Sequence, residues 1–216
     1  MKTLCIYGCG GMGRELADLA PRIDQWENII FIDDNKDSPL VVDDIPVFTL
    51  EDAQVEYNKS ELEFIISAGE PAVRERLSYK LKEADMVEAR IIDNNFILSK
   101  FSSIGKGTIV HTGATVTVNV HIGKSCLLNK HCVIGHDVNV GDYTVISPNV
   151  TIGGNVNIGS NCYIGSGAII RNGISIGDNS IIGMGAVILK DVEQSSVMVG
   201  NPAKLLRKNT DKKVFK

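Results

Sequence analysis

Aliphatic residues recur at every sixth position through more than a third of this chain. From Ile104 to Ile188, fifteen successive sixth positions hold Ile, Val or Leu. Nine of them are followed at once by Gly, and a small or β-branched residue, such as Thr108 or Cys126, often stands four positions later. A strict hexapeptide period is typical of a parallel β-helix, in which each hexad forms one flat side of a coil.

Three hexads close a triangular coil of 18 residues, so the fifteen hexads predict about five coils. We expect the aliphatic residues to fill the axis and the small residues to fit beside them. We expect the glycines to relieve crowding at the turns. The sequence therefore predicts an all-β domain over residues 96–216, a β-helix followed by a C-terminal tail.

Composition narrows the class of protein. The formal net charge of −4 argues against a surface built for nucleic acid. No stretch approaches the roughly 20 apolar residues that a membrane span needs, and the N-terminus lacks a signal-peptide layout. Three of the five cysteines occupy the small hexad position, which favours packed thiols in a reduced cytoplasm. Cys5 and Cys9 lack a second pair at zinc spacing.

Residues 1–95 have a different pattern, in which short apolar runs alternate with helical segments. We expect strands at 4–7, 28–32 and 64–68, with a glycine turn at 8–13 after the first. Helices are expected at about 14–20 and from Pro71 to about Lys82, where proline suits the first turn. Strands that alternate with helices across short loops predict a parallel sheet, here half of a Rossmann domain.

The glycine turn matches a nucleotide-binding pattern. Gly8, Gly10 and Gly13 form G-x-G-x-x-G between a strand and a helix, and Asp33 stands twenty residues after Gly13. Backbone N–H groups at such a helix start face phosphates, and the acid accepts from hydroxyls. Only one mononucleotide half fits before the β-helix, so the pattern favours a nucleotide or a nucleotide-linked sugar. NAD binding and a tight turn without a ligand remain alternatives.

The tail after Pro202 is basic, with six Lys or Arg residues and one acid, Asp211. It is either a solvated end or a segment near a phosphorylated cofactor.

One histidine stands out within the repeat. His136 lies two residues past the axial Ile134 and is followed by Asp137, which can orient the ring. A neutral imidazole is a natural general base for an amine or a hydroxyl. One coil later, 18 residues on, stands Gly154, whose amide can meet a developing oxyanion. A solvated surface histidine is the alternative.

His131 and His136 also have the H-x4-H spacing of a metal pair. His111 and His121 fall in other columns of the 18-residue coil, so a three-histidine zinc site is not indicated. We therefore expect no metal.

Several further motifs carry a resemblance that covers essentially the whole chain. They are I-Y-G-x-G-G-x-G from Ile6 to Gly13, Asp33-Asp34 with Lys36, Ala68-Gly69 with Arg74, His136-Asp137, and Val199 to Lys204 as V-G-N-P-A-K. In this order, and joined to the repeat, they resemble the bacterial nucleotide-sugar and sialic acid acyltransferases of the hexapeptide-repeat superfamily. Known members N-acetylate a UDP-linked 4-amino sugar or GDP-perosamine.

The resemblance implies a left-handed β-helix, a homotrimer, and acetyl-CoA between neighbouring subunits. It implies His136 as the base, Asp137 as its partner and the Gly154 amide as the oxyanion donor. It further implies coenzyme contacts at Val145, Gly154, Ser166, Met184 and Gly185, and nucleotide-sugar contacts at Gly10, Gly11, Met12, Asp33, Asp34, Lys36, Gly69 and Arg74. Some members carry histidines where this chain has Val145 and Met12, which affects acetyl binding and sugar contacts.

The expected function is N-acetylation of the 4-amino group of a nucleotide-linked deoxyamino sugar. We expect direct transfer, because no Ser or Cys is clearly paired with His136. O-acetylation of sialic acid or another glycan is the alternative within this enzyme class. A metalloenzyme of the carbonic anhydrase type and a non-catalytic trimeric scaffold are the alternatives outside it.

Overall fold

The computed structural model describes residues 2–35 and 37–215, so the expected substrate contact Lys36 lies outside the described residues. The N-terminal domain is a six-stranded sheet in the order β3-β4-β2-β1-β5-β6. At its centre, β1 (Thr3–Tyr7) pairs in parallel with β2 (Asn28–Ile32) and β5 (Leu62–Ile66). These three strands confirm the parallel sheet expected from the apolar runs.

Five short elements of this domain were not predicted. They are β3 (Val41–Val42), β4 (Ile45–Phe48), α2 (Leu50–Glu56), a 3₁₀ turn (Lys59–Glu61) and β6 (Val87–Glu88). Each is too short to show a hydrophobic period, and Pro46 interrupts β4. The hairpin of β3 and β4 is antiparallel, so the sheet is not wholly parallel.

Helix α1 (Gly11–Ile23) begins three residues earlier than expected, with Gly10 as its N-cap. Gly11, Met12 and Gly13 therefore belong to its first turn and not to a preceding loop. A Cβ at Gly13 would lie 2.1 Å from the carbonyl oxygen of Gly8, so only glycine lets the helix start this close to β1. Helix α3 (Pro71–Glu83) has proline in its first turn, as expected.

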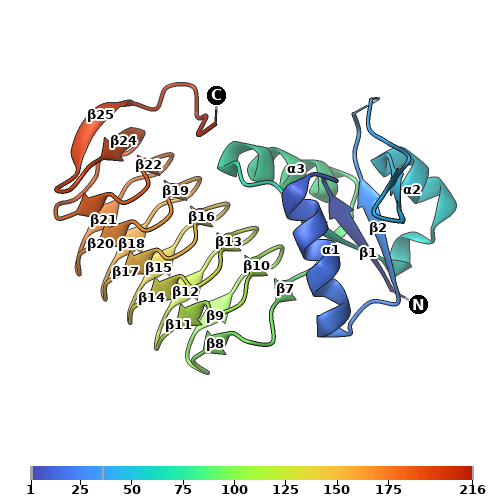
Figure 1. The fold of residues 1–216 in the computed structure, drawn as a ribbon, viewed down its shortest axis with the longest axis horizontal. Helices are drawn as coiled ribbons and strands as arrows, with labels where there is room; N and C mark the ends of the chain where they lie inside the picture. The colour runs from blue at the N-terminus through green and yellow to red at the C-terminus, as the bar shows by residue number, and fades with distance from the viewer. Residues whose placement is uncertain (1, 36, 216) are drawn as a thin grey trace.

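The rest of the chain is a triangular parallel β-helix with three faces (Figure 1). The covered face consists of β7 (Ile91–Ile92), β10 (Ile109–Val110), β13 (Leu127–Leu128), β16 (Val145–Ile146), β19 (Tyr163–Ile164), β22 (Ile181–Ile182), β24 (Ser196–Val199) and β25 (Lys204–Lys208). The last of these is antiparallel to its neighbour.

The other two faces carry different side chains. The apolar face consists of β8 (Ile97–Leu98), β11 (Thr115–Val116), β14 (Val133–Ile134), β17 (Thr151–Ile152), β20 (Ile169–Ile170) and β23 (Val187–Ile188). The polar face consists of β9 (Ser103–Ile104), β12 (His121–Ile122), β15 (Asn139–Val140), β18 (Asn157–Ile158) and β21 (Ser175–Ile176). Five complete coils result, as predicted.

The hexad positions take the expected places. All fifteen aliphatic residues from Ile104 to Ile188 are buried in one core cluster. The glycines that follow them avoid contact between coils, since a Cβ at Gly105 would lie 2.6 Å from the backbone of Gly123. The left-handed turn itself lies two residues further on, at residues such as Asn119, Asp137 and Gly167. Asn, Asp and Gly tolerate that conformation best.

The N-terminal domain packs on the covered face (Figure 1). Ile109, Leu127 and Val145 point outward from that face and join one buried cluster with Leu4 and Leu16. The first strand of the β-helix, β7, already lies within the range expected for the N-terminal domain. Burial of this apolar surface fixes how the two parts of the chain sit together.

Candidate active site

His136 occupies the corner where the chain turns from the apolar face to the polar face, between β14 and β15. Its Nδ1 lies 2.7 Å from Oδ2 of Asp137, the next residue. About half of each side chain is exposed, 53% for His136 and 43% for Asp137. The structure thus brings the expected base and acid into contact at an accessible edge.

A third residue, Asn119, donates a hydrogen bond to the carboxylate of Asp137. Its Nδ2 donates to Oδ1 of Asp137 at 2.6 Å from one coil earlier. Hydrogen bonds from Asn119 and then from His136 hold the pKa of Asp137 below its ordinary value. The sequence reasoning missed Asn119, although it stands 18 residues before Asp137 and the coil period pointed to it.

Gly154 lies against the other side of the ring. A Cβ at this glycine would be 2.5 Å from Nε2 of His136, so any larger residue would displace the imidazole. Within the described residues, the N–H of Gly154 donates to no acceptor. The structure therefore places the backbone of Gly154 against the imidazole of His136, one coil further on.

This arrangement favours proton transfer at one atom. Asp137, as a carboxylate, accepts from the protonated Nδ1, which leaves Nε2 with the free lone pair. Burial raises the pKa values of Cys126, Cys132 and Cys162 to about 12, so these thiols stay protonated inside the β-helix. None of the three is poised as a nucleophile.

Six of the expected nucleotide-sugar residues follow the carboxyl ends of β1, β2 and β5, namely Gly10, Gly11, Met12, Asp33, Asp34 and Gly69. A Cβ at Gly10 or Gly11 would meet nothing within 4 Å, so the start of α1 is open. Asp33 accepts from the N–H of Asn35 at 3.0 Å and from Sγ of Cys9 at 3.3 Å. Its carboxylate thereby stands beside the glycine turn.

Asp34 faces the opposite side of the sheet. It accepts from the N–H of Leu50 at 3.0 Å, from Nζ of Lys80 at 2.5 Å and from the hydroxyl of Tyr7. Burial alone would raise the pKa of Asp34, but these bonds outweigh it and hold the pKa below its ordinary value. The structure therefore places Asp34 at the start of α2 and beside the last turn of α3, apart from Asp33.

Arg74 does not contact a substrate site, contrary to expectation. Its side chain is fully buried between the two domains. The guanidinium donates to five backbone carbonyls, those of Ser125, Ile66, Ala68, Gly107 and Cys126. Burial lowers its pKa to about 10. The sequence could not reveal this, because nothing in it shows that α3 faces the β-helix.

The expected coenzyme residues divide into two groups. Ser166, Met184 and Gly185 stack in consecutive coils at the corner between the covered and apolar faces, where the amide of Gly185 donates to Ser166. Val145 is not at this corner. It is 2% exposed and packs into the cluster beneath the N-terminal domain, because its strand faces that domain.

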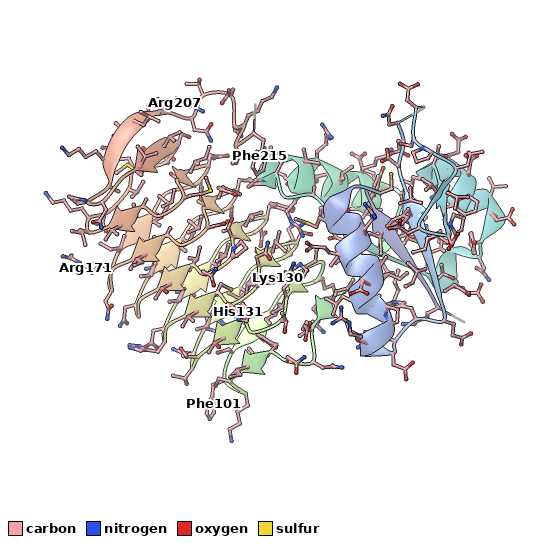
Figure 2. All side chains as sticks on the ribbon, viewed as in Figure 1. Phe101, Lys130, His131, Arg171, Arg207 and Phe215 are labelled. Atoms are coloured by element: carbon pink, nitrogen blue, oxygen red, sulfur yellow. The ribbon has the colours of Figure 1, made fainter. Side chains whose placement is uncertain are left out.

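His131 lies at this same covered–apolar corner, beside Lys130 (Figure 2). Nζ of Lys130 reaches Oε2 of Glu15 on α1 at 2.9 Å, which links the corner to the N-terminal domain. His136 lies at a different corner, so the H-x4-H pair does not converge. Among residues 2–35 and 37–215 there is no group of three His, Cys, Asp or Glu side chains placed to hold a metal ion.

One chain does not bring the two halves of the expected site together. His136 lies at the edge shared by the apolar and polar faces, and the N-terminal domain packs on the third face. In a triangular prism that edge is opposite the third face (Figure 1). The corner of His136 and the glycine turn of the same chain are therefore on opposite sides of the β-helix.

The apolar face carries an uncovered row of aliphatic side chains. Ile97, Val133 and Ile169 are 65%, 41% and 48% exposed, and Met184 at its edge is exposed as well. A row of this kind on a flat sheet is typical of a protein interface. It runs between the corner of His136 and the corner of Ser166.

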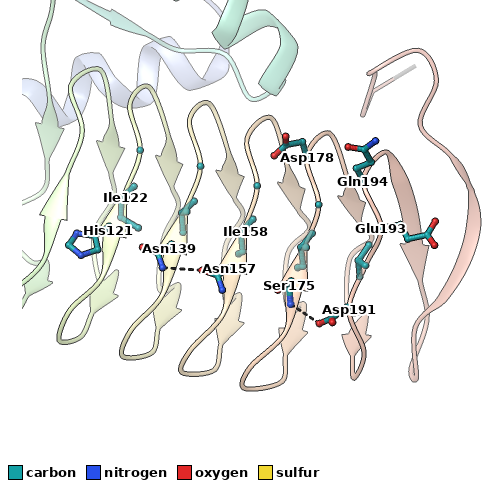
Figure 3. Close-up of a pocket in the computed structure, with 17 residues that line it drawn as sticks. His121, Ile122, Asn139, Asn157, Ile158, Ser175, Asp178, Asp191, Glu193 and Gln194 are labelled. Carbon is teal, nitrogen blue, oxygen red and sulfur yellow. Dashed lines mark hydrogen bonds between the residues drawn. The ribbon is translucent and has the colours of Figure 1, made fainter.

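The polar face forms an open groove of about 760 Å³ (Figure 3). Ser103 and His121 hydrogen-bond along it, and Asn139 donates to Asn157 at 3.0 Å. Neither His136 nor Asp137 lines this groove.

Within the part of the chain that the structure describes, no helix has the length and apolar character to cross a membrane.

Comparison with known families identifies both parts of the chain. Residues 3–81 match the PglD N-terminal domain, and residues 119–154 and 155–190 match the bacterial transferase hexapeptide (six repeats). The chain is a hexapeptide-repeat acyltransferase. The comparison with curated proteins found no significant match.

Solved structures resemble this acyltransferase over nearly its full length. The acetyltransferase domain of PglB from Neisseria gonorrhoeae is 26% identical with a TM-score of 0.90, and the match covers 95% of this chain and 100% of that one. WeeI from Acinetobacter baumannii is 29% identical with a TM-score of 0.89, over 95% and 100% of the two chains. The β-helix of the acyltransferase is left-handed, as expected.

A third structure shares the fold. It is PerB from Caulobacter crescentus in complex with CoA and GDP-perosamine, 22% identical with a TM-score of 0.86, over 96% of the acyltransferase and 98% of PerB. The PglB domain has also been solved in complex with acetyl coenzyme A.

Proposed function

We propose that the chain is an acetyl-CoA-dependent N-acetyltransferase that acts on the 4-amino group of a nucleotide-linked deoxyamino sugar. The observation that carries this proposal is the imidazole of His136, which Asp137 contacts at Nδ1 while the backbone of Gly154 lies against its other side. General base and oxyanion donor are the two groups that acyl transfer to an amine requires. The complexes of PglB with acetyl coenzyme A and of PerB with CoA and GDP-perosamine support the choice of substrates.

The reaction needs no covalent enzyme intermediate. His136 takes a proton at Nε2 as the amine nitrogen bonds to the thioester carbon. The Gly154 amide donates to the oxygen that becomes negative. The carbon–sulfur bond then breaks, and the imidazolium returns the proton to the leaving thiolate, which leaves as CoA. Asp137, held by Asn119, stabilises the imidazolium during these steps.

We propose a homotrimer built on the apolar face. If three chains turn this face toward a common axis, the corner of His136 in one chain meets the corner of Ser166 in the next. The N-terminal domain of that second chain, which covers its adjoining face, then also approaches His136. This packing covers the exposed row of Ile97, Val133 and Ile169 and unites the two halves of the site.

Acetyl-CoA would lie along the corner between two chains, with Ser166, Met184 and Gly185 of the neighbour on one side. Lys190 stands in the column of His136, three coils further on, which is about 14 Å at about 4.8 Å per coil. It lines a cavity of about 500 Å³ together with Lys204. The two ammonium groups suit the phosphates of the coenzyme.

The nucleotide sugar would lie against Gly10, Gly11, Met12, Asp33 and Gly69. The open start of α1 suits a diphosphate, because free N–H groups and the helix dipole both favour an anion. Asp33 can then accept from a ribose hydroxyl or from a base edge. We propose that the two expected domains, 1–95 and 96–216, divide these tasks. A cytoplasmic location agrees with the five free cysteines.

The test is release of CoA thiol from acetyl-CoA by the purified protein, measured with UDP-, GDP- and dTDP-linked 4-amino deoxysugars and with sialic acid. Turnover of one nucleotide amino sugar, with no turnover of sialic acid, is expected. Turnover of sialic acid alone would replace N-acetylation by O-acetylation. No turnover with any acceptor would overturn the proposal.

A further inference from the structure

The C-terminal tail returns to the N-terminal domain. After β25 the chain runs back toward α3, and Phe215 ends near that helix (Figures 1 and 2). The backbone amides of Val214 and Phe215 donate to the carboxylate of Glu70, at 2.9 Å and 3.1 Å. Hydrogen bonds from two successive amides to one carboxylate fix the tail at the start of α3.

Phe215 is 57% exposed and lies at the edge of the space between the two domains, beside the glycine turn. Its ring packs edge to face on Tyr163 of the covered face, with 5.6 Å between the ring centres. On the other side, its Cε2 would lie 4.0 Å from a Cβ at Gly69, and Cε of Met12 would lie 3.5 Å from the same point. The phenyl ring therefore borders Gly69 and Met12, two residues of the proposed nucleotide-sugar site.

The tail leaves the start of α1 open. Its amides bond to Glu70 and not to Asp33, and nothing lies within 4 Å of the Cβ positions of Gly10 and Gly11. It also occupies the Glu70 carboxylate, a negative charge next to the place where phosphates would lie. The segment that leads to Phe215 carries two exposed lysines, Lys212 and Lys213. The tail therefore forms one side of the space beside the glycine turn and does not block the start of α1.

We infer that residues 211–215 are part of the nucleotide-sugar site of their own chain. Docked on Glu70, the segment provides an aromatic wall at Phe215 and positive charge for the diphosphate. This inference rests on the proposed function, because it assigns the tail to the acceptor substrate and not to acetyl-CoA.

Docking is tested first, without reference to activity. Trypsin cleaves after exposed lysines, so cleavage at Lys212 and Lys213 reports whether the tail is held. We expect Glu70→Ala to be cut there several times faster than the natural protein. The matched variant Glu56→Ala, at the exposed end of α2, should be cut at the natural rate. Equal rates in all three proteins would show that the tail is not docked and would overturn the inference.

The role in binding is tested with Phe215→Ala in the full chain. We expect KM for the nucleotide amino sugar to rise about tenfold, while kcat and KM for acetyl-CoA change less than twofold. Calorimetry with UDP, GDP and dTDP should show the same loss in Kd for whichever diphosphate binds. An unchanged KM and Kd, or tighter binding, would overturn the inference.

The two proposals fail in different ways. If no amino sugar is turned over but Phe215→Ala weakens binding of a nucleoside diphosphate, the wall stands and the acetylation proposal falls. If the protein acetylates a nucleotide amino sugar and Phe215→Ala leaves the KM for that sugar unchanged, the acetylation proposal stands and the inference about the tail falls. If the natural protein binds none of the three diphosphates, the wall has no ligand and is rejected.

Discussion

Nε of Arg74 donates to the carbonyl oxygen of Ser125 at 2.6 Å, and this bond joins the N-terminal domain to the β-helix. Four further carbonyls share the same guanidinium, which is inaccessible to water. Burying a cation is costly unless its donors are satisfied, and here backbone carbonyls accept from the guanidinium while the nearby negative charge of Glu88 favours its charged form. Arg74 therefore sets the position of α3 on the covered face.

Replacing Arg74 by Lys should destabilise the protein without affecting substrate recognition directly. An ammonium group offers three donors where the guanidinium offers five, so at least two buried carbonyls lose a partner. At about 1–3 kcal/mol for each, the free energy of unfolding should fall by about 2–6 kcal/mol. Urea unfolding measures this. A variant of natural stability with a raised KM for the nucleotide sugar would restore the substrate-binding role expected from the sequence.

Removing the base should slow the chemical step. His136→Ala should lower kcat by on the order of 10²–10⁴-fold, with small changes in the KM values, because general base catalysis is lost. Thiol release from acetyl-CoA measures the rate. His121→Ala, the same change at an exposed histidine of the polar face, is the control and should keep natural turnover. Comparable rates in both variants would refute the role of His136.

A methyl group at Gly154 should have a large effect on the rate and a small one on stability. Its Cβ would lie 2.5 Å from Nε2 of His136, so the half-exposed ring must move away. A displacement of about 1 Å at a catalytic group can cost about 10²-fold in rate. We expect Gly154→Ala to lose about that much in kcat with little change in Tm. A fully active variant would mean that Nε2 does not act beside this backbone.

Two inactive variants should complement each other if sites form between chains. His136→Ala removes the base, and Asp33→Ala damages the acceptor site on the opposite side of the same chain. When both are co-expressed, about a quarter of the sites combine an intact His136 with an intact Asp33 from a neighbour. Activity should therefore reappear in the mixture. Sedimentation should give about three times the chain mass of 23.4 kDa. A monomer, or a mixture without activity, would contradict the shared site.

The stability of the N-terminal domain should depend on pH through Asp34. Its pKa in the folded protein is lower than the ordinary value of 3.8, because the N–H of Leu50, the ammonium group of Lys80 and the hydroxyl of Tyr7 donate to the carboxylate. Stabilisation by this group is complete above that ordinary value and is lost as pH falls through the lower, folded-state pKa. The Tm of Asp34→Asn should thus be lower than natural at pH 7, and the difference should shrink below about pH 4. A difference independent of pH would exclude the carboxylate charge as its cause.

The hexad period predicted both the fold and the contact between His136 and Gly154, and it did so for one physical reason. Coils stack in register, so residues 18 apart are neighbours, and His136 meets Gly154 whatever the rest of the chain does. The same rule places Asn119 beside Asp137, and Asn, Asp or Gly at the third position after most of the aliphatic residues marks the left-handed turns. Both signals were present in the sequence and were overlooked.

Contacts between the two domains were not predictable in this way. Arg74, Val145 and Phe215 all lie where the N-terminal domain meets the covered face, and no periodicity relates residues of the two domains. Asp33 and Asp34 illustrate a related limit. Successive residues after a strand point to opposite sides, so only one of two adjacent acids stays beside the glycine turn.

The register between coils also restricts how this protein can change length. An insertion or deletion of one residue within the repeat would turn every later side chain out of its column and carry axial aliphatic residues to the surface. Only gain or loss of a whole coil keeps the columns, and one placed between His136 and Lys190 would also alter the reach required of the coenzyme by about 4.8 Å. The edge of the β-helix that carries His136 can therefore change its length only in steps of 18 residues. The loops of the N-terminal domain can change their length one residue at a time.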